Sequence, residues 1–246
     1  MRPNLLRSLA TRVAEREYAG LLRRARALDS TSGTRVAING HELLNFCSND
    51  YLGLAQDPRI VKVLQDAAND YGIGGTASHL VCGHHREHEQ LEQALCEWTG
   101  RDAALLFSSG WLANLGAMQA LLNRDSVCVQ DKLNHASLLD AAQLSGATLK
   151  RYPHVDHDGA ARQLASISDK PALLATDGVF SMDGDVAPLA EIVELARKYR
   201  AAVTIDEAHA VGVVGPNGAG LVAKLGLERE VDIHVGTLSK ALGAYG

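Results

Sequence analysis

The stretches AVTIDEAH, residues 202–209, and DIHVGTLSK, residues 232–240, decide the fold of this 246-residue chain. Each begins as a short apolar run of strand length and ends in polar residues. Similar apolar runs precede them at residues 104–107, 127–130, 148–152 and 172–176. Between the runs lie helical patterns, such as residues 188–200, where apolar positions recur at helical spacing behind a proline. This alternation predicts an α/β fold, a mainly parallel sheet sandwiched by helices.

Polar clusters follow the predicted strands at the point where each strand ends. In parallel sheets, ligands bind beyond the carboxyl ends of the strands, so these clusters are expected to meet along one edge. The side chains gathered there by fold position are Gly110, Ser181, Asp206, His209, Thr237 and Lys240, with His135 joining from the loop after the second strand of this set.

Three of these features together match what pyridoxal 5'-phosphate (PLP) requires of a protein. A desolvated lysine such as Lys240 is partly deprotonated and can act as a nucleophile. A carboxylate at the end of a buried strand, such as Asp206, can hold a heteroaromatic nitrogen protonated. Gly110 precedes a predicted helix, whose exposed N–H groups and positive end suit a phosphate.

Four motifs carry a resemblance to a known family: CSNDYLGL (residues 47–54), residues 178–189, DEAH (206–209) and TLSKALG (237–243). In this order and spacing they resemble the α-oxoamine synthases, fold type I PLP enzymes of the aspartate aminotransferase superfamily. The resemblance runs from about residue 23 to residue 246. It implies an N-terminal helix and hairpin segment, residues 1–46, and an incomplete PLP-binding large domain, residues 47–246.

The resemblance also implies parts that this chain is expected to lack. The family has a last sheet strand, a small C-terminal domain and, within that domain, an arginine for the amino-acid carboxylate. We expect all three to be absent, which leaves open that the 246 residues form an inactive fragment.

The resemblance assigns the ring of the cofactor to five residues. Lys240 is expected to hold PLP as a Schiff base and then to move the substrate α-proton. Asp206 is expected to pair with the pyridine nitrogen, and His209 and Ser181 to hydrogen-bond the ring hydroxyl. His135 is expected to stack on the ring face. From the residues alone, Ser181 could equally satisfy a turn, and His135 could be an ordinary loop histidine.

Five further assignments concern the phosphate and the substrate. The backbone of Gly110 and Trp111 and the side chain of Thr237 are expected to hold the phosphate; Thr237 could cap a helix at the same time. Asn49 falls in the family's substrate-side segment. Arg23 is expected near a substrate carboxylate, which a guanidinium fork suits. Arg23 could instead lie on the solvent-exposed face of a helix.

The implied reaction is a decarboxylative condensation of an amino acid with an acyl thioester. Residues 22–24, 134–140 and 181–189 are most similar to the branch that joins L-alanine to a pimeloyl thioester, on CoA or an acyl carrier protein, in biotin synthesis. Sister enzymes that use glycine with acetyl-CoA or succinyl-CoA, or serine with a long acyl-CoA, remain alternatives. The family also implies a homodimer. A non-catalytic subunit on this fold is disfavoured, because such members lose the lysine that Lys240 matches.

Three positions depart from the family pattern. Trp111 stands where a smaller aromatic is common, Asp177 where glutamate is frequent, and His79 where some relatives carry arginine. A separate motif, H-x-x-E-H in residues 84–88, is typical of inverted zinc proteases and could place His84 and His88 on one helix face. Because it is short and histidines are dense there, we interpret it as a chance match and expect no metal.

Composition and charge exclude several other classes. The net charge of −5 gives no basic surface for nucleic acid. The uncharged stretch 103–123 contains polar residues and a glycine turn, which favours a strand and a buried helix over a membrane span. The four cysteines form no C-x-x-C pair, and the N-terminus does not read as a signal peptide. These features favour a reduced cytosolic setting.

Overall fold

The computed structural model describes residues 4–167 and 169–246. The chain forms two compact units, Met1–Ser48 and Asn49–Gly246. The boundary between them lies close to the domain boundary expected after residue 46. The larger unit contains the motifs that carry the family resemblance from residue 49 onward.

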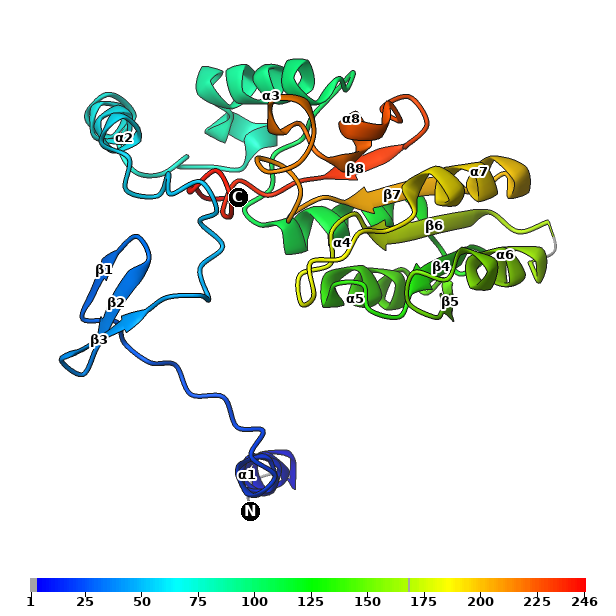
Figure 1. The fold of residues 1–246 in the computed structure, drawn as a ribbon, viewed down its shortest axis with the longest axis horizontal. Helices are drawn as coiled ribbons and strands as arrows, with labels where there is room; N and C mark the ends of the chain where they lie inside the picture. Colours follow the sequence, from blue (N-terminus) through cyan, green and yellow to red (C-terminus); the bar gives the residue numbers. More distant parts are fainter. Residues whose placement is uncertain (1–3, 168) are drawn as a thin grey trace. The chain divides into compact units, whose positions relative to one another are not determined.

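The N-terminal unit is a helix followed by a small antiparallel sheet (Figure 1). Helix α1 spans Asn4–Tyr18, and strands β1 (Ser30–Ser32), β2 (Arg35–Ile38) and β3 (His41–Leu44) pair in that order. Within the described part of this unit, Val36 is the buried hydrophobic residue. The structure has a helix and antiparallel strands in this segment, with a third strand beyond the expected hairpin, and the division into domains at residue 46 stays a prediction.

The larger unit is built on a five-stranded parallel sheet, in the order β5-β4-β6-β7-β8 (Figure 1). The strands are β4 (Val127–Asp131), β5 (Thr148–Tyr152), β6 (Ala172–Asp177), β7 (Ala202–Asp206) and β8 (Ile233–Val235), and every neighbouring pair is parallel. The register pairs Asp177 with Asp206, the last residues of two adjacent strands. Five of the predicted strands are thus confirmed.

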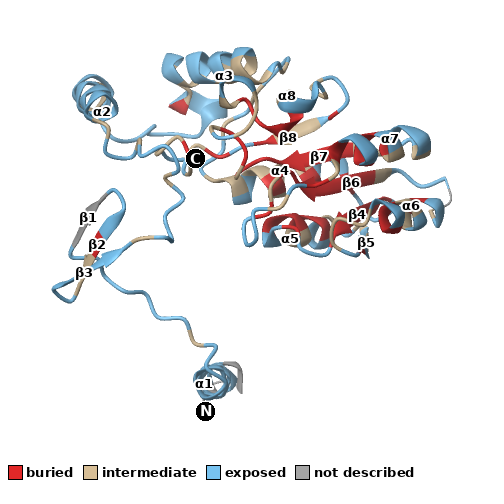
Figure 2. Ribbon diagram, viewed as in Figure 1, coloured by how far each residue is buried: buried red, intermediate tan, exposed pale blue. Residues whose placement is uncertain are grey.

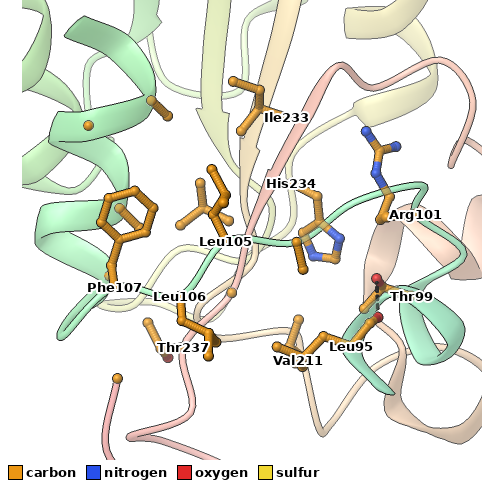
Figure 3. A pocket seen from close by; sticks show the side chains of 18 of the residues that line it. Leu95, Thr99, Arg101, Leu105, Leu106, Phe107, Val211, Ile233, His234 and Thr237 are labelled. Atoms are coloured by element: carbon orange, nitrogen blue, oxygen red, sulfur yellow. Dashed lines mark hydrogen bonds between the residues drawn. The ribbon is translucent and has the colours of Figure 1, made fainter. Parts of the chain in front are cut away.

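The strand predicted at residues 104–107 is wrong for this structure. These residues form no ladder with any described strand, and Leu106 N–H donates instead to a side-chain oxygen of Glu92, at 3.2 Å. A strand needs a partner backbone about 4.8 Å away. Here an apolar cavity of about 460 Å³ separates the segment from β8 (Figure 3). The apolar run is present, but its hydrogen-bonding partner is not.

Helices cover both faces of the parallel sheet, as predicted (Figures 1 and 2). On one face, α4 (Gly110–Leu121) and α5 (Ala136–Ser145) pack their apolar residues, Met118 and Leu138 among them, against β4 and β6. On the other face, α6 (His157–Ala165), α7 (Leu189–Tyr199) and α8 (Leu221–Leu225) contribute to a second core with Ile192 and Ile205. The buried strands between them fix the positions of the residues at the strand ends.

Two more helices and two short turns complete the larger unit. Helix α2 (Pro58–Tyr71) begins behind Asp57, whose side chain caps it, and α3 (Arg86–Thr99) begins behind His85. The turns are η1 (His79–Gly83) and η2 (Pro216–Gly218). The structure leaves no residue of α3 fully buried. None of the helices in the described ranges is long and apolar enough to cross a membrane.

Candidate active site

A polar cavity of about 120 Å³ lies at the carboxyl ends of β6 and β7. Seven of the predicted site residues line it: Gly110, Trp111, His135, Asp206, His209, Thr237 and Lys240. The structure adds further lining residues that the sequence did not single out as a site, including Asn114 and Asp177. Segments far apart in the sequence therefore meet in one cavity, as the parallel sheet requires.

The carboxylate of Asp206 is buried and held from two sides. It is 6% exposed, and it accepts hydrogen bonds from Asn114 Nδ2 at 2.6 Å and from the backbone N–H of Ala208 at 2.9 Å. Hydrogen bonds of this kind fix the orientation of a carboxylate that has left water. The amide oxygen of Asn114 is buried and has no partner, so a polar acceptor is left over beside the cavity.

A chain of hydrogen bonds connects His135 to Asp206. The Nδ1 atom of His135 lies 2.7 Å from Ser137 Oγ, and Asn114 Nδ2 donates to the same hydroxyl at 2.9 Å. Because Asn114 Nδ2 also donates to Asp206, the orientations of the histidine and the carboxylate are linked through Ser137. The Trp111 ring meets His135 edge-on, with ring centroids 5.7 Å apart.

Asp177 places a second carboxyl beside Asp206. It is 4% exposed and accepts from the backbone N–H of His135, which lies 3.2 Å from both of its oxygens. Burial, reinforced by the negative charge of Asp206, raises the pKa of Asp177 to about 8. The sequence marked Asp177 only as a departure from the family pattern; its position at the end of β6 was the signal that it lines the site.

Lys240 and His209 both have lowered pKa values at this cavity. Burial lowers the pKa of the Lys240 amine, although the carboxylates of Asp206 and Asp177 oppose the shift. Burial, followed by the charge of Lys240, lowers the pKa of His209 to about 4. At neutral pH His209 is therefore an uncharged hydrogen-bonding group. An amine with a lowered pKa is a better nucleophile than a solvated lysine.

Tyr51 connects Asn49 to the site. Its hydroxyl lies 2.8 Å from Nδ1 of His209 and donates to Oδ1 of Asn49 at 3.1 Å. Asn49 itself does not line the cavity; it reaches the site through Tyr51 and His209. Tyr51 was not among the predicted site residues, although it belongs to the CSNDYLGL motif that suggested Asn49.

The start of α4 forms a close contact with Thr237. Ser109 caps the helix by accepting from the backbone N–H of Leu112, and Gly110 is its first residue. A Cβ atom added to Gly110 would lie 2.5 Å from Cγ2 of Thr237, so only glycine fits there without a shift. Free N–H groups at the start of a twelve-residue helix, beside a threonine hydroxyl, suit a phosphate.

One further predicted residue of the larger unit, Ser181, is not brought to the cavity, and Arg23 lies in the other unit. Ser181 is exposed in the loop after β6 and is not among the residues that line it. Arg23 belongs to the N-terminal unit, where it is exposed and lies after the end of α1 in an irregular segment. The alternative that Arg23 lies on the solvent-exposed face of a helix is therefore wrong. The roles expected for Ser181 and Arg23 toward the cofactor and the substrate stay predictions.

A comparison with models of known protein families identifies the family to which this chain belongs. The family model described as aminotransferase class I and II matches residues 41–246. This chain belongs to that family. Its cavity residues, from Gly110 to Lys240, fall inside the matched range.

The curated relatives have a more specific name. The chain is 54% identical to the 8-amino-7-oxononanoate synthase of Xylella fastidiosa (strain M12) over 226 residues, which cover 91% of this chain and 56% of that protein. It is 53% identical to the enzyme of the same name from Xanthomonas axonopodis pv. citri (strain 306), covering 100% of this chain and 62% of the relative. The chain thus spans about three fifths of the length of the curated relatives it matches.

A solved structure in the family shows the same arrangement of elements. Serine palmitoyltransferase from S. paucimobilis, with a bound PLP–myriocin aldimine, superimposes with a TM-score of 0.91 at 32% sequence identity. The match covers 100% of this chain and 63% of that structure. The predicted aspartate aminotransferase-like fold is therefore confirmed for the larger unit.

Proposed function

We propose that this cavity binds PLP and that the whole protein joins L-alanine to a pimeloyl thioester, releasing carbon dioxide, the free thiol of the acyl carrier and 8-amino-7-oxononanoate. The observation that carries the proposal is the pairing, in one cavity, of a half-buried lysine with a carboxylate held by Asn114. The names of relatives more than half identical to this chain support the choice of reaction.

The residues present fit the cofactor at three points. The contact between Gly110 and Thr237 excludes a Cβ atom, and both residues line the cavity into which an anion would bind. Asp206 offers a buried, oriented carboxylate, and Lys240 offers an amine with a lowered pKa. When bound, PLP supplies an aldehyde for amines and a ring that withdraws electrons from the substrate α-carbon.

Each side chain has a defined task in this proposal. Lys240 Nζ would hold the cofactor at its aldehyde carbon, and would take and return the proton at the substrate α-carbon. Asp206 would accept a hydrogen bond from the protonated ring nitrogen. Neutral His209, oriented by Tyr51, hydrogen-bonds the ring hydroxyl. The α4 N-terminus and Thr237 bind the phosphate, and His135 covers one ring face.

Substrate choice rests on the relatives rather than on the cavity. Sister enzymes that condense glycine with acetyl-CoA or succinyl-CoA are the second candidate function, and the likeness to serine palmitoyltransferase extends the set to serine. The identity of the acyl donor, pimeloyl-CoA or a pimeloyl carrier protein, is part of the same choice of substrate. We further propose that the protein works as a cytosolic homodimer, which light scattering on the full-length protein tests.

The experiment is an absorbance titration of the full-length protein with PLP, followed by a substrate panel. We expect visible aldimine absorbance that Lys240→Ala abolishes and that Lys224→Ala, a change at an exposed lysine on α8, leaves intact. L-Alanine with pimeloyl-CoA should release carbon dioxide faster than glycine with acetyl-CoA or succinyl-CoA. A colourless wild-type protein would overturn the PLP site, and preference for glycine would overturn the substrate choice.

A further inference from the structure

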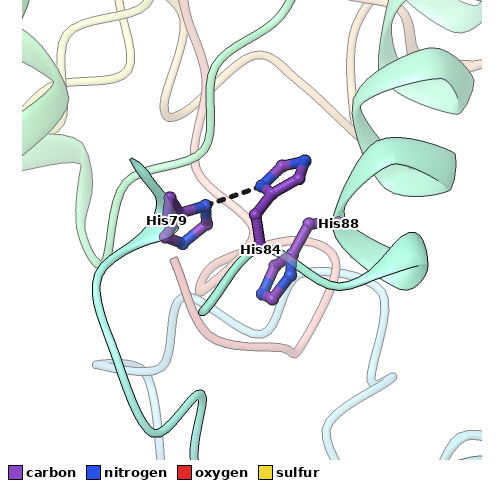
Figure 4. Close-up of side chains that lie close together, drawn as sticks. All are labelled: His79, His84 and His88. Carbon is purple, nitrogen blue, oxygen red and sulfur yellow. Dashed lines mark hydrogen bonds between the residues drawn. The ribbon is translucent and has the colours of Figure 1, made fainter. Parts of the chain in front are cut away.

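Three histidines converge outside the PLP cavity: His79 in η1, His84 just after it, and His88 in the first turn of α3 (Figure 4). The H-x-x-E-H motif contains only His84 and His88, and two imidazoles alone gave no reason to expect a metal. The structure adds His79, five residues before His84 along the chain. None of the three lines the 120 Å³ cavity.

The rings are close enough to share one ion. One nitrogen from each of the three rings lies within 4.8 Å of the others, and Nδ1 of His79 is 2.8 Å from Nδ1 of His84. The ring centroids of His79 and His88 are 4.7 Å apart, and those of His84 and His88 are 5.4 Å apart. Tetrahedral zinc bound at about 2.0–2.1 Å by each nitrogen holds its ligand atoms roughly 3.3 Å apart. Small rotations of the side chains reach that geometry.

The loop that carries His79 and His84 is closed tightly on itself. A Cβ atom on Gly83 would lie 1.9 Å from the backbone oxygen of Ala77, so glycine is required at that crossing. Thr76 adopts a positive φ of 60°, which is uncommon for a threonine. This backbone conformation fixes the directions in which His79 and His84 project. The positions of these two ligands are therefore set by the fold of the loop.

We propose that His79, His84 and His88 bind a divalent ion of the zinc class, which ties the η1 loop to the start of α3. Neutral imidazole suits zinc, nickel, cobalt and copper, whereas magnesium and calcium prefer oxygen. Three protein ligands leave a fourth position for water. The proposed condensation reaction does not use these three histidines.

Two existing contacts have to give way for the ion: the hydrogen bond between Nδ1 of His79 and Nδ1 of His84, and one made by His88. The backbone N–H of His85 donates to Nδ1 of His88 at 2.9 Å, which leaves the proton of the neutral ring on Nε2. Binding the ion through Nε2 requires the ring proton to move to Nδ1, and binding through Nδ1 requires the ring to turn away from His85, so this contact is lost in either case. Cys82 lies in η1 but is not one of the three convergent ligands, so a thiolate is not needed for the site.

The test is calorimetric titration of zinc into the full-length, untagged and chelator-treated protein, with cobalt absorbance as a second probe. We expect one zinc per chain in the wild type, in Cys82→Ser and in His157→Ala, which changes an exposed histidine on α6. In His79→Ala and His84→Ala the affinity should fall at least roughly tenfold. Zinc should raise the melting temperature of the wild type, and that rise should disappear in both variants.

Several outcomes would overturn the proposal. Absence of zinc binding by the wild type would do so, as would equal affinity in His79→Ala. Loss of binding in Cys82→Ser would also do so, by showing a different ligand set. Melting temperatures measured without zinc separate a lost ligand from a lost fold, because a folded variant that no longer binds supports the site. Retention of zinc by the His79→Ala/His84→Ala double variant would show that the ion sits elsewhere.

Discussion

Asn114 donates a hydrogen bond of 2.6 Å to Oδ2 of Asp206, although 92 residues separate them in the sequence. Both side chains are buried, and the same amide nitrogen donates to Ser137. Asn114 therefore orients the carboxylate on which the proposed PLP chemistry depends. It acts through Asp206 and is a positioning residue.

Removal of this amide is expected to weaken PLP binding. A hydrogen bond to a charged group contributes about 1.5–3 kcal/mol, so Asn114→Ala should raise the dissociation constant of PLP by roughly 10-fold to 100-fold. Absorbance titration of the full-length protein measures it. Gln143→Ala, at an exposed amide on α5, is the matched control. Unchanged affinity in Asn114→Ala would show that Asp206 needs no help with its orientation.

The contact between Gly110 and Thr237 predicts a mutation and its rescue. Gly110→Ala drives a Cβ atom to 2.5 Å from Cγ2 of Thr237, and overpacking of this kind costs about 1–3 kcal/mol of stability. The phosphate cradle is displaced at the same time, so PLP binding should weaken too. Thr237→Ser removes Cγ2 and keeps the hydroxyl.

The double variant Gly110→Ala/Thr237→Ser should therefore recover much of the lost stability and PLP affinity. Urea unfolding and PLP titration of the two single variants and the double variant give the interaction between the sites. Additive effects of the two changes would show that the steric contact is not the cause.

The raised pKa of Asp177 predicts a dependence of stability on pH. Below its ordinary value of 3.8 the carboxyl is protonated in both states, and between 3.8 and about 8 the unfolded chain loses that proton while the folded chain keeps it. The stabilising contribution of Asp177 to the free energy of unfolding is therefore fully present below pH 3.8. It is lost as the pH rises toward 8 and then stays level.

Asp177→Asn removes this titration. In the PLP-free protein, the variant should gain about 3–4 kcal/mol relative to wild type between pH 5 and pH 8. Urea unfolding at both pH values checks the difference. Asp125→Asn, at an exposed carboxyl, should show no such gain. Parallel pH profiles for Asp177→Asn and wild type would mean that Asp177 is ionised in the folded protein throughout this range.

The contacts of Glu207 predict a purely structural effect beside Asp206. It is fully buried, accepts from the backbone N–H groups of Leu221 and Val222 at the start of α8, and lies 3.0 Å from Nε2 of His234. Glu207→Ala leaves these donors without an acceptor and should cost about 3 kcal/mol of stability.

Glu207→Gln keeps one oxygen for the α8 backbone and should lose less. Thermal unfolding and urea titration measure both variants, and PLP affinity of the folded fraction separates this effect from damage to Asp206. A Glu207→Ala variant as stable as Glu207→Gln would show that the backbone contacts at α8 contribute little.

The sequence predicted some residues of the cavity and missed others. Lys240, Asp206 and His209 were found because they follow apolar runs, and the ends of parallel strands share one edge. Asn114 and Ser137 were missed, since both lie within helices where a polar residue normally reads as an exposed position. Their function appears only when α4 and α5 pack side by side on the sheet.

The sequence by itself determined the alternation of strands and helices, the parallel sheet and most of the residues that line the polar cavity, because periodicity and strand-end position are local properties that the chain order carries. Tertiary structure alone decided the rest: the partner of Asp206, the raised pKa of Asp177, the missing ladder at residues 104–107 and the meeting of His79 with His84 and His88. Each of these depends on burial or on contact between distant segments. Such contacts are set by packing and hydrogen bonding in three dimensions, which no local pattern records.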